Sequence, residues 1–184
     1  MNLFFTTKQG MEKGGFTLIE TLVSVFILSL AIVVPMTIAS RTLFSSVIAR
    51  DQVTASYLAQ EAIEAVRSVR DQNRLANVTW DTDFPAKGSN FTIDVVNINA
   101  VTSKPTMTLC SGACVPINYD SSTHLYQYSA IVGTNAATSF IRTVRLDSIP
   151  TNANEMAVTV TVSWNVGSNA RTFTTRENLL NWQN

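Results

Sequence analysis

Few side chains in this sequence belong to the types that carry chemistry on their own. Glu20 is the only charged residue within the apolar residues 16–39, and His124 is the only histidine. A carboxylate inside lipid is costly unless it reaches the interface or a cation, so Glu20 predicts an interfacial position or a specific cationic partner. No nucleophile or base motif adjoins His124, so we expect it to be an ordinary loop or strand-start residue and we expect no catalytic residues.

The two cysteines lie close together in the sequence "CSGAC". Cys110 and Cys114 are either two free thiols or, if this part of the chain lies outside the cytoplasm, a short-loop disulfide. A structural zinc site would need two further ligands, which one histidine and no other cysteine do not supply in an ordinary set. There is no phosphate loop, metal signature or cofactor fingerprint, so we expect no metal, no cofactor and no enzymatic activity.

Length and charge narrow the class of protein. The chain has 184 residues, 13 of them acidic and 13 basic. This balance argues against nucleic acid as a main partner, because phosphate binding requires a basic surface. The residues after the apolar run are enough for one compact domain with its own core, so we expect one soluble head.

Residues 16–39 are long and apolar enough to cross a membrane as a helix. At about 1.5 Å per residue, the run spans a hydrocarbon core of roughly 30 Å. A buried core helix would be unusually long and lacks a polar face, and a cleaved secretory signal has a shorter apolar stretch. Basic residues both precede the run (Lys8, Lys13) and follow it (Arg41, Arg50), so they do not set its orientation.

The string "KGGFTLIE" (13–20) resembles the class III signal of type IV prepilins and type II secretion pseudopilins. The resemblance implies cleavage by a prepilin peptidase between Gly15 and Phe16 on the cytoplasmic side, and methylation of the new Phe16 amine. It also implies that Glu20 pairs with the N-terminal amine of a neighbouring subunit during assembly. The implied partners are the prepilin peptidase/N-methyltransferase, other pilin or pseudopilin subunits and inner-membrane lipid.

A second, amphipathic helical segment continues from the apolar one and is expected to end after Arg74, where turn formers follow. Its apolar positions recur at spacings of three and four: Phe44, Val47, Ile48, Ala55, Leu58, Ala62, Ala65, Val66 and Val69. Gln60, Glu61, Glu64, Arg67, Arg70 and Asp71 mostly fall elsewhere, so we expect a solvated face with weak ion pairs. Pro35 should kink or loosen the apolar half.

The remainder of the chain predicts β-strands. Expected strands are residues 91–101, with Phe91, Ile93 and Val95 on one face, and residues 125–133, 139–149, 155–167 and 170–178, with a loop over 101–123. The clearest face carries Met156, Val158, Val160, Val162, Trp164 and Val166, and another carries Phe140, Arg142, Val144 and Leu146. A turn at 167–169 predicts a hairpin. We therefore expect an α+β, pilin-like fold, with the long helix packed on an antiparallel sheet of about four strands.

The C-terminal part is similar to the last hairpin of a pilin subfamily described as type IV pilus modification or minor pilin proteins. Trp164 matches its central strand tryptophan, and Leu180, Asn181 and Trp182 match its "L-x-N-W" tail. The two resemblances imply a leader (1–15), a transmembrane assembly helix (16–39), its amphipathic continuation (40–74) and an extracytoplasmic head (75–184).

These features predict a minor pilin in a type IV pilus-like filament, anchored by one pass in the inner membrane with its N-terminus in the cytoplasm. The alternatives are a minor pseudopilin of a type II secretion system and a binding subunit at the filament tip, for adhesion or DNA uptake. Tyr119, Tyr126 and Tyr128 near Asp120 either contribute to a sugar- or surface-binding patch or, as we expect, pack across strands. The sequons at Asn77 and Asn90 carry no weight without evidence of glycosylation.

Overall fold

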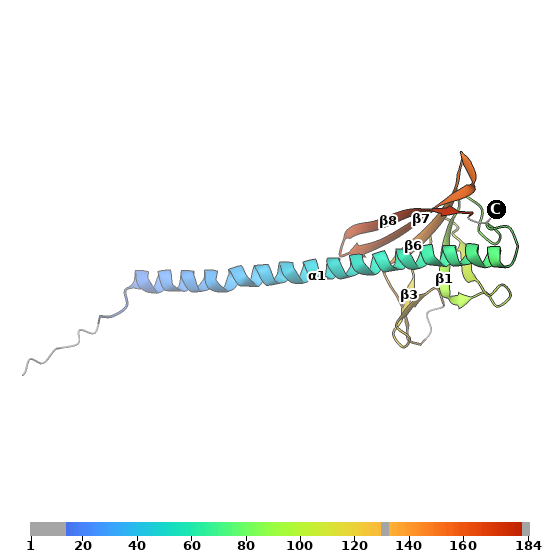
Figure 1. The fold of residues 1–184 in the computed structure, drawn as a ribbon. Helices are drawn as coiled ribbons and strands as arrows, with labels where there is room; N and C mark the ends of the chain where they lie inside the picture. Colours follow the sequence, from blue (N-terminus) through green and yellow to red (C-terminus); the bar gives the residue numbers. More distant parts are fainter. Residues whose placement is uncertain (1–13, 130–132, 182–184) are drawn as a thin grey trace, which may run out of the picture. The chain divides into compact units, whose positions relative to one another are not determined.

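The computed structural model describes residues 14–129 and 133–181, which form two compact units divided between Val47 and Ile48. Figure 1 shows the elements. The single α-helix of the described residues is α1 (Leu18–Leu75), and the main strands are β1 (Asn90–Ile98), β2 (Pro105–Leu109), β6 (Ile141–Ile149), β7 (Asn152–Val166) and β8 (Asn169–Leu180). Three short strands are β3 (Asn118–Asp120), β4 (Leu125–Gln127) and β5 (Asn135–Ala137). Of the predicted leader (1–15), residues 1–13 lie outside the described residues.

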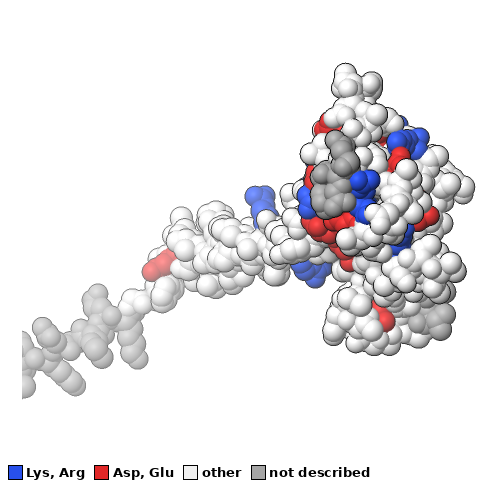
Figure 2. Space-filling view, turned by 45° about the vertical axis from the view of Figure 1, so that its right-hand side comes forward, with Lys and Arg blue, Asp and Glu red and all other residues white. Residues whose placement is uncertain are grey.

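In the first unit, α1 exposes its apolar side chains. By length and composition this helix is able to cross a membrane, and none of the residues in its most apolar 18-residue stretch is buried. Figure 2 shows this part of the chain as a mostly uncharged surface. The hydroxyls of Thr21, Ser29 and Thr37 each donate to a backbone carbonyl one turn earlier, at 2.8 Å. These polar groups are therefore satisfied without water, as lipid requires. The helix continues without a break through Pro35.

In the second unit, α1 packs through a stripe of small and branched side chains. Its buried apolar residues are Ala55, Leu58, Ala59, Ala62, Ile63, Ala65, Val66 and Val69. Six of these match the predicted stripe, and Ala59 and Ile63 widen it. Ile48 is partly buried against the core. The prediction was wrong for Phe44 and Val47, which are 52% and 40% exposed. Both precede the unit that contains the sheets.

The helix ends where the turn-forming sequence predicts. Val78 N donates to Asn73 O and Asn77 N donates to Arg74 O, both at 3.1 Å, and Asn77 has a positive φ of 57°. This is a Schellman arrangement, in which a residue in the left-handed conformation lets the chain satisfy the last helical carbonyls. Asn77, noted in the sequence only as a possible glycosylation site, therefore serves as the C-terminal cap of α1.

The predicted fold class is confirmed: α1 packs against antiparallel β-structure. The main sheet has five strands in the order β2-β1-β6-β7-β8, and a separate small sheet has the order β4-β3-β5. The expected faces of β6 and β7 are buried without exception: Phe140, Arg142, Val144, Leu146, Met156, Val158, Val160, Val162, Trp164 and Val166. The β7–β8 hairpin is also confirmed, with Val166 opposite Asn169 across a two-residue turn in which Gly167 has a φ of 62°.

The strand count and two boundaries were wrong. The segment 101–123 is not a loop throughout, because β2 and β3 lie within it. The expected strand 125–133 is described only as β4, which belongs to the small sheet; residues 130–132 lie outside the description. These strands are short and mostly half-exposed, so they lack the alternation that marks a strand in a sequence. In β1, Thr92 and Asp94 are buried beside Phe91 and Ile93, so this strand is covered on both faces.

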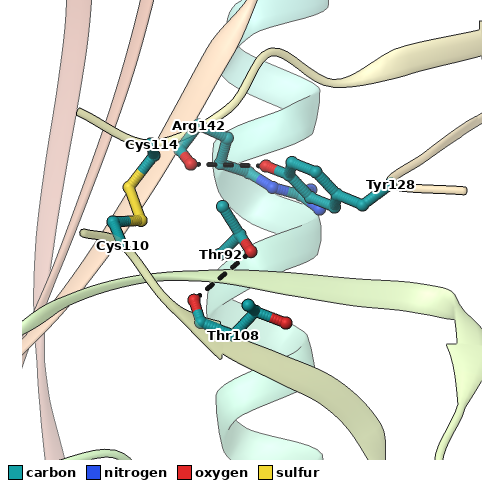
Figure 3. The surroundings of a disulfide bond; sticks show 6 residues. All are labelled: Thr92, Thr108, Cys110, Cys114, Tyr128 and Arg142. Atoms are coloured by element: carbon teal, nitrogen blue, oxygen red, sulfur yellow. Dashed lines mark hydrogen bonds between the residues drawn. A yellow bond between two sulfur atoms is a disulfide. The ribbon is translucent and has the colours of Figure 1, made fainter. Parts of the chain in front are cut away.

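Cys110 and Cys114 are joined by a disulfide in the structure (Figure 3). Cys110 directly follows β2, and its N–H donates to Asn90 O at 3.0 Å. Next to the disulfide, the Thr92 hydroxyl of β1 donates to Thr108 O of β2 at 3.5 Å. The disulfide thus fixes the turn that leads from the edge of the main sheet toward the small sheet.

Candidate processing and assembly site

The residues at the start of α1 form a helix cap around Glu20. The N–H of Glu20 donates to the Thr17 hydroxyl at 3.3 Å, three positions earlier. Thr-x-x-Glu is the spacing of a capping box, in which the threonine satisfies a backbone N–H that has no partner in the first turn. Local sequence therefore fixes the start of the helix at Leu18 and places the Glu20 carboxylate in its first turn.

The position of Glu20 has an electrostatic consequence. The N-terminal end of a helix carries a partial positive charge, so an acid in the first turn is stabilising there. A cut after Gly15 would place a new ammonium group at Phe16, two residues before the helix, where the same field is unfavourable. Glu20 is exposed, and none of the residues in 14–129 and 133–181 forms a salt bridge with it. Its carboxylate is therefore available to a cation from outside the described chain.

The chain's own packing does not require the two glycines before the helix. A Cβ built at Gly14 or Gly15 meets no atom within 4 Å, and neither residue has a positive φ. Phe16 is 76% exposed. Folding therefore does not restrict the size of the side chain at positions 14 and 15. Any such restriction comes from a partner that binds this segment.

Two of the three tyrosines considered for a binding patch, Tyr119 and Tyr126, pack across strands. Tyr119 and Tyr126 are direct partners on β3 and β4, with ring centroids 5.1 Å apart. Tyr119 Oη and His124 Nδ1 are hydrogen-bonded at 2.9 Å. Tyr128 lies apart from them, with its ring 5.7 Å from the Arg142 guanidinium, and burial raises the pKa of its hydroxyl. No group of three or more His, Cys, Asp or Glu side chains suited to a metal occurs in the described part of the chain.

Sequence reasoning placed Arg142 on a core-facing strand face but did not predict the contacts that it makes there. It is fully buried, and its guanidinium donates to Leu58 O at 3.1 Å, to Ile93 O at 2.5 Å and to the Glu61 carboxylate. The prediction of a solvated face with weak ion pairs on α1 was therefore wrong at Glu61, whose partner is a fully buried arginine. Arg67 forms an ion pair with Glu64 on the same face, as predicted, and a second one with Glu177 on β8; the hydrogen bond to Glu177 raises the Arg67 pKa. The available signal was an arginine at a core-facing strand position.

Asp120 ties the small sheet together and makes it sensitive to acid. Its carboxylate accepts hydrogen bonds from the Thr134 and Ser122 hydroxyls, both at 2.7 Å, from Ser122 N at 2.9 Å and from the Thr123 hydroxyl at 3.0 Å. These bonds, that from Thr134 first, hold the Asp120 pKa below its usual 3.8. A carboxyl group with a depressed folded-state pKa stabilises the fold above its unfolded-state pKa, and this contribution is lost as the pH falls toward the folded value.

We therefore expect amide exchange in β3–β5 to speed up as the pH is lowered from about 5 to about 3, after correction for the intrinsic pH dependence of exchange. Asp120→Asn keeps the shape and cannot titrate, so it should exchange faster than the parent at the higher pH, and the difference between the two should narrow as the pH falls. Hydrogen exchange followed by mass spectrometry measures this difference. Parallel pH profiles for parent and variant would contradict the role given to Asp120.

Comparison with known proteins agrees with the geometry at the start of α1. Residues 11–34 match the family model described as "Prokaryotic N-terminal methylation motif". No curated protein and no solved structure matches the chain. The motif implies processing by a prepilin peptidase and assembly with other pilin-like subunits, and it belongs to structural subunits. The chain therefore carries the N-terminal methylation motif of the type IV prepilin-like family.

Proposed function

We propose that this chain is a minor pilin of a type IV pilus-like filament. It is cleaved after Gly15, methylated on the Phe16 amine and assembled through its N-terminal helix. The observation that carries the proposal is the methylation motif at the start of an exposed apolar helix, with Glu20 in the first turn and no salt-bridge partner within the described residues. A structural subunit needs no catalytic group.

The free-energy cost of the Glu20 carboxylate in lipid supports a role in assembly. A carboxylate held within an apolar environment is stable only when it is paired. In a filament, the Phe16 amine that the cut creates on a neighbouring subunit supplies a cation at the depth of Glu20. A subunit cannot remain uncut and still offer that amine. Cleavage and pairing would thus be coupled, so that only processed subunits enter the filament.

The proposed layout follows from the same argument. Residues 1–15 are the leader, residues 16–39 cross the inner membrane once with the N-terminus in the cytoplasm, residues 40–74 continue the helix, and residues 75–184 form the head outside that membrane. The disulfide between Cys110 and Cys114 supports an extracytoplasmic head, because such bonds persist in oxidising compartments. Partners are the prepilin peptidase/N-methyltransferase, other pilin subunits and inner-membrane lipid.

The minor role is supported by the resemblance of the C-terminal hairpin to minor pilins. Trp164 is buried at the core of this hairpin, while Trp182 of the matched tail lies outside the described residues. In filaments sheared from the host's cells, we expect the chain to be present in far smaller amount than a major subunit. Detection only in the membrane fraction of cells that bear filaments would contradict the proposal. Periplasmic filaments linked to secretion would instead favour a pseudopilin.

Gly15 provides a test of processing that is separate from folding. Since a Cβ at position 15 meets no heavy atom of the described chain within 4 Å, Gly15→Leu should fold as the parent does but retain the leader, with processing reduced at least about tenfold, or about 1.4 kcal/mol in the barrier. Gly14→Leu, equally unhindered in the fold, is the matched control and should be processed. Gel mobility of the two variants in cells with an active peptidase gives the result. Normal processing of Gly15→Leu would contradict the assigned cut site.

A further inference from the structure

Three side chains from separate segments of the second unit meet near the end of α1. Lys104 Nζ lies 2.5 Å from Asn73 Oδ1 and 2.6 Å from Asp83 Oδ2. Asn73 belongs to α1, Asp83 to the connection between α1 and β1, and Lys104 immediately precedes β2. An amine, a carboxamide and a carboxylate are thus in contact.

The carboxamide is held in one orientation. Asn73 is fully buried, and its Nδ2 donates to Trp80 O at 3.1 Å and to Thr82 O at 2.6 Å. Its carbonyl end therefore faces Lys104, whose side chain is only 13% exposed. Such positioning of a nucleophile against an electrophile lowers the entropic part of a reaction barrier.

We propose that Lys104 and Asn73 form an intramolecular amide bond. The neutral Lys104 amine attacks Asn73 Cγ, the new Nζ–Cγ bond forms, the Cγ–Nδ2 bond breaks, and one ammonia leaves. The reaction needs no oxidant, reductant or further reactant, and the product is an isopeptide cross-link.

Asp83 is placed to move the proton that this step requires. Its carboxylate accepts the proton that the Lys104 ammonium gives up before the attack and returns it to the departing nitrogen. Nζ gives up a second proton as the amide forms, and the ammonia leaves with it as ammonium, so the net charge of the site falls by the lost lysine charge. The carbonyls of Trp80 and Thr82 accept hydrogen bonds from that nitrogen and stabilise it as it becomes protonated. A cavity of about 230 Å³, lined by Asp83, Asn99 and Lys104 among others, adjoins the site and gives the ammonia a path out.

The chain contains its own comparison. Lys87 pairs with Asp81 at 3.2 Å in the same connection between α1 and β1. That pair has an amine and a carboxylate, but within residues 14–129 and 133–181 no asparagine carbonyl is hydrogen-bonded to Lys87. Lys87 should therefore keep its free amine, and it serves as the matched control.

The cross-link would tie the end of α1 to the start of β2. It would close the chain from 73 to 104 covalently and restrict the unfolded state as a disulfide over a similar loop does. The proposal does not depend on the role in a filament, because it rests only on contacts within the second unit.

The test is peptide mass spectrometry of the full-length chain, purified in detergent, with its disulfide reduced and alkylated before trypsin digestion. We expect peptide 71–74 attached to the peptide that contains Lys104, with a mass lower than the two unlinked peptides by one ammonia. Lys104→Arg should give the unlinked peptide 71–74, and Lys87→Arg should remain cross-linked. Unlinked peptide 71–74 together with a Lys104 that reacts with an amine reagent in the unfolded parent would overturn the proposal.

Asp83→Ala tests the proton transfer, since it keeps both reacting groups. We expect its cross-linked fraction, followed over time after purification, to be at least about tenfold lower than that of the parent. An equal fraction in parent and variant would overturn the role of Asp83.

Discussion

Glu20→Ala is expected to leave the protein in the membrane and to remove it from filaments. The alanine keeps the apolar helix intact and makes insertion easier, because a costly carboxylate is gone. It also removes the partner proposed for the amine of a neighbouring subunit, and that amine would then be buried without compensation. Loss of one member of a buried pair costs about 3–5 kcal/mol, so incorporation should fall by at least about a hundredfold.

Two variants separate charge from other effects in this experiment. Glu20→Gln keeps the size of the side chain and should fail in the same way if the charge is what matters. Glu64→Ala removes an exposed acid on the same helix, in the second unit, and should enter filaments normally. Membrane and sheared-filament fractions are compared by immunoblot. Filament levels of Glu20→Ala equal to those of Glu64→Ala would contradict the pairing role.

Arg142→Ala is expected to cause the largest loss of stability among single substitutions in the second unit. Arg142 is fully buried, and its removal leaves Leu58 O and Ile93 O without these donors and Glu61 without its cation. The Glu61 side chain is 35% exposed, so water recovers part of its loss. The two carbonyls and the space left by the side chain remain costly, and together we expect a loss of about 3–5 kcal/mol.

Arg145→Ala is the matched control for that substitution, because it lies on the same strand. Its side chain is 48% exposed and pairs with Asp147, and exposed pairs contribute about 0–1 kcal/mol. Urea unfolding followed by the fluorescence of the buried tryptophans measures both variants. Since small domains have about 5–15 kcal/mol of stability, Arg142→Ala should shift the midpoint far below that of Arg145→Ala. Equal midpoints would show that the buried arginine is not what joins helix and sheet.

Local patterns in the sequence were sufficient to predict the helix and strands that bury one face and expose the other. The alternation from Met156 to Val166 predicts β7, and the turn after it predicts the hairpin with β8. The stripe from Ala55 to Val69 predicts the packed part of α1. In each case a period in the sequence corresponds to a face in the structure. β2 and β3 lack such a period because their burial is partial, so the sequence predicts a loop at these positions.

The candidate sites divide in the same way. The start of α1 is local: glycines, Phe16, Thr17 and Glu20 adjoin one another, so their spacing carries the information. The contacts of Arg142 and of Lys104 join residues that are far apart in the chain, and no short motif records them. Residues such as Arg142 and Asn73 signal these contacts only as polar side chains at positions where burial is expected.

The mature N-terminus directly tests whether the chain is cleaved after Gly15 and methylated on the Phe16 amine. The chain is purified from its host with an active prepilin peptidase, and its first peptide is identified by mass spectrometry. We expect a chain that begins at Phe16 and carries one methyl group on its amine. A chain that retains residues 1–15 under these conditions would contradict it.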